Sequence, residues 1–190
     1  MQHPPYPVAV STVSKIFAFL LLAGVGVILF VVLSPENFAP QFADAPGNTA
    51  PQPTIPDAAQ PATVNYVLDG DTLFLDTPAD SNLKVRLLAV DTPEVGDNAE
   101  CFGDEARGYL RDQLPEGSTV YTLADEDETD QYARALLFVW TSDGTFINLD
   151  LAASGYAEAV FIGNNRLYEA EFEAAEDTAH DSGAGRWGSC

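Results

Sequence analysis

The feature that most constrains this chain is an uncharged apolar segment near its N-terminus. Residues 16–33 are 18 residues without a charged side chain, and nearly all of them are apolar. As a helix rising about 1.5 Å per residue, the segment spans about 27 Å, close to the thickness of a bilayer's hydrocarbon core. Because it is apolar on every face, it is not typical of a buried helix in a soluble domain. We therefore expect a transmembrane helix at 16–33, preceded by a short tail at 1–15.

The flanking charges indicate an orientation for this helix. Lys15 precedes the segment, whereas Glu36 and Asp44 follow it. This asymmetry favours an N-terminus inside the cell and the rest of the chain outside, held at the cell membrane. Cleavage as a signal peptide, which would secrete the protein, is the alternative, with Ala43-Asp44-Ala45 as the nearest small-x-small site. The apolar run is longer than a typical signal core, which favours the uncleaved anchor.

A proline-rich segment follows the apolar run. Residues 34–61 hold seven prolines and six alanines in 28 residues, with no hydrophobic period. Such a composition buries too little apolar surface to offset the entropy of ordering. We expect a disordered linker at 34–61, so the folded domain is predicted at 62–190.

Residues 62–190 carry the patterns of a small α+β domain. Alternating or continuously apolar runs predict five strands, and apolar residues at helical spacing predict three helices. The strands are expected at 64–68, 72–76, 83–90, 119–123 and 134–141, and the helices at 104–114, 148–154 and 166–180. Strands come first with one helix inserted, which favours an α+β fold whose five strands close into a small barrel.

The charge balance restricts the class of partner. The formal net charge is −21, with two lysines against six arginines. This excludes a partner held mainly by a basic patch. A self-repelling surface is best tolerated in molar salt, where the Debye length is about 3 Å. We therefore expect a halophilic protein; an acidic protein from a moderate habitat is the alternative.

Three polar clusters interrupt the predicted strands. Asp69-Gly70-Asp71-Thr72 places two carboxylates beside a glycine turn, which suits a hard cation such as calcium, although Asp-Gly turns are also common. Arg86 lies within an apolar strand and must find an anion, either a ligand or a structural partner. Asp91 and Glu94 follow at the end of that strand, and Arg134 begins another.

Carboxylates for a metal, two arginines and a spare glutamate together predict phosphodiester hydrolysis. In such a site a metal neutralises a phosphate oxygen, a base activates water and arginines stabilise the developing charge. Arginine fits this role better than lysine because its planar fork can hold two phosphate oxygens.

The order and spacing of these clusters resemble the staphylococcal nuclease (thermonuclease) family over residues 62–187. The motifs are Asp-Gly-Asp-Thr, then Arg-Leu-Leu-x-Val-Asp-Thr-Pro-Glu, then Asp-x-Tyr-x-Arg. The resemblance implies an OB-fold barrel with three helices and calcium-dependent cleavage of DNA and RNA that leaves 3′-phosphates. By position it implies calcium ligands at Asp71, Asp91 and the Thr92 carbonyl, an outer-shell Asp69, a Glu94 that positions or deprotonates water, phosphate-binding Arg86 and Arg134, and substrate contacts from Tyr132.

The sequence departs from the family in its substrate-facing loops. Two tyrosines that family members use against the nucleotide correspond to Phe161, which can stack on a base, and to Gly163, which cannot. Residues 125–130 are nearly all acidic. This stretch is expected to be a solvated loop, with a second calcium site as the alternative.

Cys101 and Cys190 are the only cysteines. A location outside the cell permits a disulfide between them, and a bridge closing a loop of about 90 residues would contribute about 4 kcal/mol in the chain-entropy model. Two free or intermolecularly bonded thiols are the alternative.

Together the sequence predicts a membrane-tethered, extracellular, calcium-dependent endonuclease whose partner is its nucleic-acid substrate. No protein partner is evident, and a monomer is expected. Two other functions remain open: a catalytically silent binding module, and a surface domain that uses the same carboxylates to bind calcium structurally.

Overall fold

The computed structural model describes residues 52–190. The predicted tail at 1–15, the predicted membrane helix at 16–33 and most of the predicted linker at 34–61 lie outside the described residues. Within residues 52–190, every helix is too short or too polar to cross a membrane.

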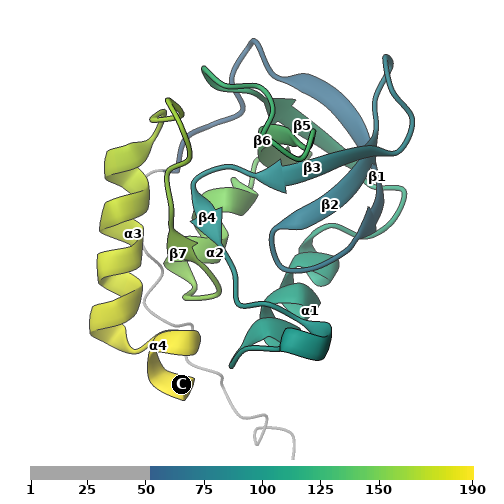
Figure 1. The fold of residues 1–190 in the computed structure, drawn as a ribbon. Coiled ribbons are helices and arrows are strands. Elements are labelled where there is room, and N and C mark those ends of the chain that lie inside the picture. Colours follow the sequence, from purple (N-terminus) through teal and green to yellow (C-terminus); the bar gives the residue numbers. More distant parts are fainter. Residues whose placement is uncertain (1–51) are drawn as a thin grey trace, which may run out of the picture. The chain divides into compact units, whose positions relative to one another are not determined.

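A closed barrel of five strands forms the centre of the domain (Figure 1). Its strands are β1 (Gln60–Val67), β2 (Thr72–Asp76), β3 (Leu83–Leu87), β6 (Ala135–Thr141) and β5 (Thr119–Leu123), in that order around the barrel. All neighbours are antiparallel except β3 and β6, which run parallel. The prediction of a five-stranded barrel in an α+β fold is therefore confirmed.

The predicted strand at 83–90 is two strands. β3 ends at Leu87, and β4 (Val90–Asp91) pairs outside the barrel with β7 (Glu158–Ala159). Ala89 between them adopts a left-handed conformation with φ of 62°. The buried Asn148 side chain holds the turn by donating to the Leu88 carbonyl at 2.9 Å. Because Leu88, Ala89 and Val90 are all buried, the apolar pattern runs through the break without marking it.

Three main helices accompany the barrel. They are α1 (Gly103–Gln113), α2 (Ile147–Ala153) and α3 (Glu169–Ser182), with a short α4 (Arg186–Ser189) at the C-terminus. Of these, α3 packs against α2 and β7 rather than against the barrel strands. Figure 1 shows α3 along the side opposite the barrel, with the β4–β7 pair between them. The core continues from the barrel to α3 through fully buried aromatic side chains, including Phe138, Trp140, Phe146 and Phe172. The sequence predicted the three main helices, with α3 displaced by two to three residues, but not α4.

The ordered fold begins before the predicted boundary at residue 62. β1 starts at Gln60, and Ile55 packs against the core. The Trp140 indole donates a hydrogen bond to the Pro53 carbonyl at 3.0 Å. Part of the predicted linker, at Pro53 and Ile55, therefore packs against the domain, and Pro53 supplies the acceptor that a buried tryptophan N–H requires.

A disulfide joins Cys101 and Cys190, whose Cα atoms lie 6.0 Å apart. It connects the chain just before α1 to the last residue, just after α4. The C-terminal helix is thereby held beside the loop that precedes α1.

Candidate active site

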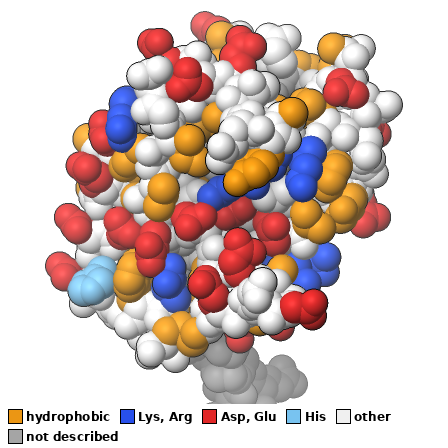
Figure 2. Space-filling view, in the orientation of Figure 1, with side chains coloured by type: hydrophobic (Ala, Val, Ile, Leu, Met, Phe, Trp, Pro, Cys, Tyr) orange, Lys and Arg blue, Asp and Glu red, His pale blue; other side chains and the backbone are white. Residues whose placement is uncertain are grey.

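Most of the predicted site residues lie together on the outside of the barrel, beside β2, β3 and β4. They surround a cavity of about 170 Å³. Figure 2 shows acidic side chains gathered on this face with basic side chains beside them. The cavity is lined by Asp69, Asp71, Thr72, Arg86, Asp91, Thr92, Pro93, Glu94 and Arg134.

The turn between β1 and β2 directs Asp71 into the cavity. Asp69 Oδ1 accepts hydrogen bonds from the backbone N–H groups of Asp71 and Thr72, at 3.1 and 2.7 Å. Gly70 packs directly on Thr92, since a Cβ at this position would lie 2.6 Å from the Thr92 hydroxyl. Any larger residue would push Thr92 away, so glycine is needed for this close approach.

Asp71 is the most enclosed carboxylate of the cluster, with 7% of its surface exposed. Its Oδ2 accepts from the Thr92 backbone N–H at 3.0 Å and from the Thr92 hydroxyl at 3.1 Å. Its Oδ1 accepts from the Thr72 hydroxyl at 3.1 Å. Both oxygens are therefore fixed in position before any ligand binds.

Arg86 lies between two carboxylates. Only 5% of the residue is exposed. Its Nη1 lies 3.1 Å from Asp71 Oδ2, and its Nη2 donates to Asp91 Oδ1 at 2.6 Å. Nη1 also donates to the Val90 carbonyl at 2.7 Å. The expectation that a buried Arg86 must find an anion is met within the chain by Asp71 and Asp91.

The carboxylates of the cavity raise one another's pKa values. Burial raises the pKa of Asp69, and the charge of Asp71 adds to this effect. Burial also raises the pKa of Asp91 against the opposing charge of Arg86, and the charge of Asp71 adds to the rise. The pKa of Glu94 lies above its usual range through desolvation and the charges of Asp69, Asp71 and Asp91. The cavity therefore holds more negative charge than Arg86 neutralises, which favours a bound cation.

Glu94 is held by the loop that follows it. Its backbone N–H donates to Glu100 Oε2 at 3.2 Å, and its carbonyl accepts from the Glu100 N–H at 2.9 Å. A Cβ on Gly103 would lie 2.2 Å from the Glu94 carbonyl oxygen, so α1 begins in close contact with this loop. Neither Glu100 nor Gly103 had a predicted role, because their contacts depend on how the loop closes.

Arg134 reaches the cavity from the start of β6 and is oriented by Asp130. Its Nε donates to Asp130 Oδ2 at 2.6 Å, and its backbone N–H donates to Asp130 Oδ1 at 2.9 Å. Although burial acts to raise it, the pKa of Asp130 is lowered by these bonds from Arg134. Asp130 was part of the predicted motif without a role; its spacing of four residues from Arg134 was the signal that could have indicated one.

Tyr132 lies beside the cavity rather than in its wall. The Arg134 guanidinium sits 5.5 Å from the centre of the Tyr132 ring, and 71% of Tyr132 is exposed. Tyr132 and Arg134 both line a neighbouring cavity of about 450 Å³ that also includes Leu136 and Ile162. Arg134 therefore connects the acidic cavity to a more apolar one.

Phe161 lines neither of these two cavities. It packs edge-on against the buried Phe172, with the Arg166 guanidinium 5.5 Å from its ring centre. Gly163 adopts a positive φ of 62°, and a Cβ added there would collide with the Asp127 carboxylate. The structure thus brings the other predicted site residues to the acidic cavity or its edge, whereas Phe161 packs against the hydrophobic core.

The acidic loop at 125–130 uses its carboxylates to hold neighbouring backbone. Asp127 Oδ2 accepts from the Asn164 N–H at 2.8 Å, and Asp125 Oδ2 accepts from the Leu167 N–H at 2.9 Å. Neither this loop nor any other part of residues 52–190 places three acidic, histidine or cysteine side chains where they could hold a metal ion together. The loop is therefore solvated as expected at Glu126, Glu128 and Thr129, which are exposed, while Asp125 and Asp127 also hold neighbouring backbone.

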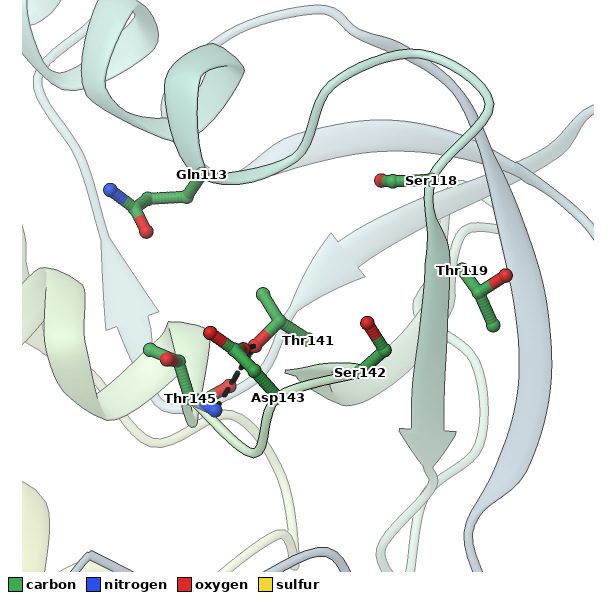
Figure 3. Close-up of a pocket in the computed structure, with 7 residues that line it drawn as sticks. All are labelled: Gln113, Ser118, Thr119, Thr141, Ser142, Asp143 and Thr145. Carbon is green, nitrogen blue, oxygen red and sulfur yellow. Dashed lines mark hydrogen bonds between the residues drawn. The ribbon is translucent and has the colours of Figure 1, made fainter.

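A larger cavity, of about 280 Å³, lies between the end of α1 and the β5–β6 hairpin (Figure 3). Asp143 is its only charged lining residue, and the Asp143 carboxylate already accepts a hydrogen bond from Thr141. It contains no cation to bind phosphate and no second acid, so it lacks the chemistry of the smaller cavity.

Comparisons with known proteins agree with this site. The family described as "Staphylococcal nuclease homologue" matches residues 84–189. The thermonuclease of Staphylococcus intermedius is 32% identical over 127 residues, covering 65% of this chain and 74% of that protein. The thermonuclease of Staphylococcus hyicus is 33% identical, covering 60% of this chain and 67% of that protein. Endonuclease YhcR of Bacillus subtilis is 32% identical over 72% of this chain, which spans only 12% of that larger protein.

Proposed function

This chain belongs to the family of staphylococcal nuclease homologues, and on that premise we propose that it is a calcium-dependent endonuclease acting on DNA and RNA. The observation that carries the proposal is the 170 Å³ cavity on which four carboxylates and two arginines converge. Acids that can bind a cation and activate water lie there beside cations that can bind phosphate.

The donor set of the cavity fits calcium. Its side chains offer carboxylate oxygens, which hard divalent cations prefer. Burial raises the pKa values of Asp69 and Asp91, and the charge of Asp71 adds to both rises. Asp71 and Asp91, with the Thr92 carbonyl, are proposed to hold the ion, and Asp69 to support it from the outer shell. A bound cation would neutralise charge on the phosphate oxygens.

The remaining catalytic roles are assigned to side chains of the cavity. Glu94 accepts the proton of the attacking water, and its raised pKa brings its basicity closer to neutral pH. Arg86 and Arg134 donate hydrogen bonds to phosphate oxygens that gain charge in the transition state. The water oxygen bonds to phosphorus as the bond from phosphorus to the 5′ oxygen breaks. The 5′ oxygen takes up a proton from solvent, so the products are a 3′-phosphate and a 5′-hydroxyl. Tyr132 is proposed to contact the neighbouring phosphate.

We also propose that the domain works outside the cell. The apolar segment at 16–33 and its flanking charges support an anchor in the cell membrane, with secretion after cleavage as the alternative. The disulfide between Cys101 and Cys190 supports an oxidising compartment. The net charge of −21 supports a high-salt habitat.

Hydrolysis of single-stranded DNA by the full chain tests the nuclease proposal. The assay compares calcium with a chelator in molar salt and identifies the product ends. We expect calcium-dependent cleavage that leaves 3′-phosphates. A folded chain that binds calcium and DNA without cleaving it would contradict the proposal and favour a binding module.

A further inference from the structure

Two aromatic side chains stack on the outside of the barrel, next to the acidic cavity. Tyr66 on β1 and Phe74 on β2 have ring centres 4.8 Å apart and planes 9° from parallel. Tyr66 is 37% exposed, and Leu68 beside it is 36% exposed. We call Tyr66 and Phe74 the aromatic platform. Figure 2 shows hydrophobic side chains over β1 and β2 at the edge of the acidic cluster.

The aromatic platform is not explained by core packing. Neither of its rings belongs to the hydrophobic core or to the partly buried side chains that pack against the core. β-strand surfaces that face water normally carry polar side chains, so an exposed Tyr66 stacked on a partly exposed Phe74 indicates contact with something else.

Strand register connects the aromatic platform to the site. Tyr66 pairs with Phe74, and Phe74 pairs with Lys84 on β3. Two residues further along β3, Arg86 pairs with Thr72 and faces the cavity. Side chains two residues apart on a strand share a face, so Lys84 and the aromatic platform lie on the same outer face of the sheet as Arg86 and the cavity. The two residues that separate Lys84 from Arg86 along β3 span about 7 Å, which equals the rise of about two stacked nucleotides.

The charges around the aromatic platform suit a polyanion. Within residues 52–190, Lys84 and Arg111 are the two basic side chains without an acidic partner. Lys84 Nζ lies 5.9 Å from the Phe74 ring centre, and Arg111 donates to the Val67 carbonyl, next to Tyr66. The remaining cations of this region are ion-paired: Arg86, Arg107, Arg134, Arg166 and Arg186. In a chain of charge −21, the two cations of residues 52–190 that lack a carboxylate partner therefore both lie near the platform.

We infer that the aromatic platform is a base-stacking subsite for single-stranded nucleic acid, resting on the proposed nuclease function. An unpaired base stacks on Tyr66, while Lys84 and Arg111 attract the adjoining phosphates. Single strands are favoured over duplexes because their bases can leave the stack and lie on an aromatic ring. The subsite would hold a longer substrate whose scissile phosphate lies in the cavity.

The test compares a short and a long single-stranded oligonucleotide. The short one fills only the cavity, and the long one extends over the aromatic platform. The full chain is compared with Tyr66→Ala, Tyr66→Trp, Lys84→Gln and the matched control Leu167→Ala, which alters another exposed apolar side chain. Circular dichroism checks folding. Binding of the long oligonucleotide is measured by fluorescence anisotropy with chelator, and kcat/KM with calcium.

We expect Tyr66→Ala to weaken binding of the long oligonucleotide by about fivefold or more. It lowers the ratio of kcat/KM for the long substrate to that for the short one by a similar factor. Tyr66→Trp keeps both the affinity for the long oligonucleotide and the kcat/KM ratio close to those of the unaltered chain. Lys84→Gln weakens binding of the long oligonucleotide in low salt. Leu167→Ala changes neither the affinity nor the kcat/KM ratio.

Equal affinity of a folded Tyr66→Ala chain and the unaltered chain for the long oligonucleotide would overturn the subsite. Tyr66-dependent binding by a chain that cleaves no substrate would support the subsite while contradicting the nuclease proposal. The binding and cleavage measurements thus separate the two failures.

Discussion

Arg86 organises the candidate site even before a ligand binds. It is nearly buried and bridges Asp71 and Asp91, so it neutralises part of a cluster that would otherwise repel itself. The same guanidinium is proposed to bind phosphate. Its pairing with two carboxylates sets the spacing that a cation and a phosphate would share.

Replacing Arg86 should therefore destabilise the fold as well as the site. Arg86→Met leaves Asp71 buried without its cation, and breaking a buried pair typically costs about 3 kcal/mol or more. Urea unfolding in chelator measures this loss. The control Arg107→Met removes an exposed pair with Asp104 and should cost less than about 1 kcal/mol. Equal losses in the two variants would show that Arg86 has no special structural role.

Residue types predicted much of the site, whereas its supporting contacts could not be predicted. The clusters around Asp71, Arg86 and Glu94 were visible because charged residues interrupt apolar strands. Glu100 and Asn148 act through contacts with backbone groups of Glu94 and Leu88, which exist only once the loops close. Nothing in their local sequence distinguishes them from other polar residues.

At the level of elements, a partly buried polar contact joins α1 to α2. The Tyr109 hydroxyl on α1 donates a hydrogen bond to Asp150 on α2. Burial raises the pKa of Tyr109, and the bond to the negative Asp150 raises it further. The folded chain therefore holds the phenolic proton more tightly than the unfolded chain does.

This shift makes stability depend on alkaline pH. The contribution of Tyr109 is fully present below the unfolded pKa of about 10 and is lost as the pH rises toward the higher folded value. Tyr109→Phe should cost about 1–3 kcal/mol at neutral pH, because the partly buried Asp150 loses its donor. It should also flatten the decline in unfolding free energy above about pH 10. Parallel declines in both proteins, measured by urea unfolding across pH, would contradict this assignment.

The disulfide between Cys101 and Cys190 fixes the C-terminal end to the loop before α1. The bridge spans 89 residues of sequence, so its removal should cost about 4 kcal/mol in the chain-entropy model. The Cys101→Ser/Cys190→Ser variant should unfold at lower urea concentration than the oxidised chain. Mass spectrometry of non-reduced peptides should recover the linked pair; two free thiols in the native chain would reject the bridge.

Elements with clear periodicity were predictable, and elements defined by tertiary contacts were not. β2 and β5 have the predicted bounds because alternation and flanking turns define them. The break after Leu87 depends on the left-handed Ala89, and the ordering of Pro53 depends on distant Trp140. The four-residue α4 is too short to show a helical period.

At the scale of the whole molecule, net charge sets the response to salt. A charge of −21 repels both itself and a polyanionic substrate. Raising salt from about 0.1 M to about 1 M shortens the Debye length from about 10 Å to about 3 Å. We expect the unfolding free energy and the rate of DNA cleavage both to rise over this range, opposite to the usual counterion-release trend. A rate that falls steadily from low to molar salt would contradict the prediction.

The most direct test of the central claim is a double-mutant cycle on one cleavage rate. The full chain, Glu94→Gln, Arg134→Ala and the double variant are compared for kcat on single-stranded DNA with calcium, beside the exposed controls Glu173→Gln and Arg107→Ala. If Glu94 and Arg134 serve one transition state, each single variant loses about 10²-fold or more, and the double variant loses far less than the product. Near-wild-type rates in both folded single variants would show that this cavity is not the catalytic site.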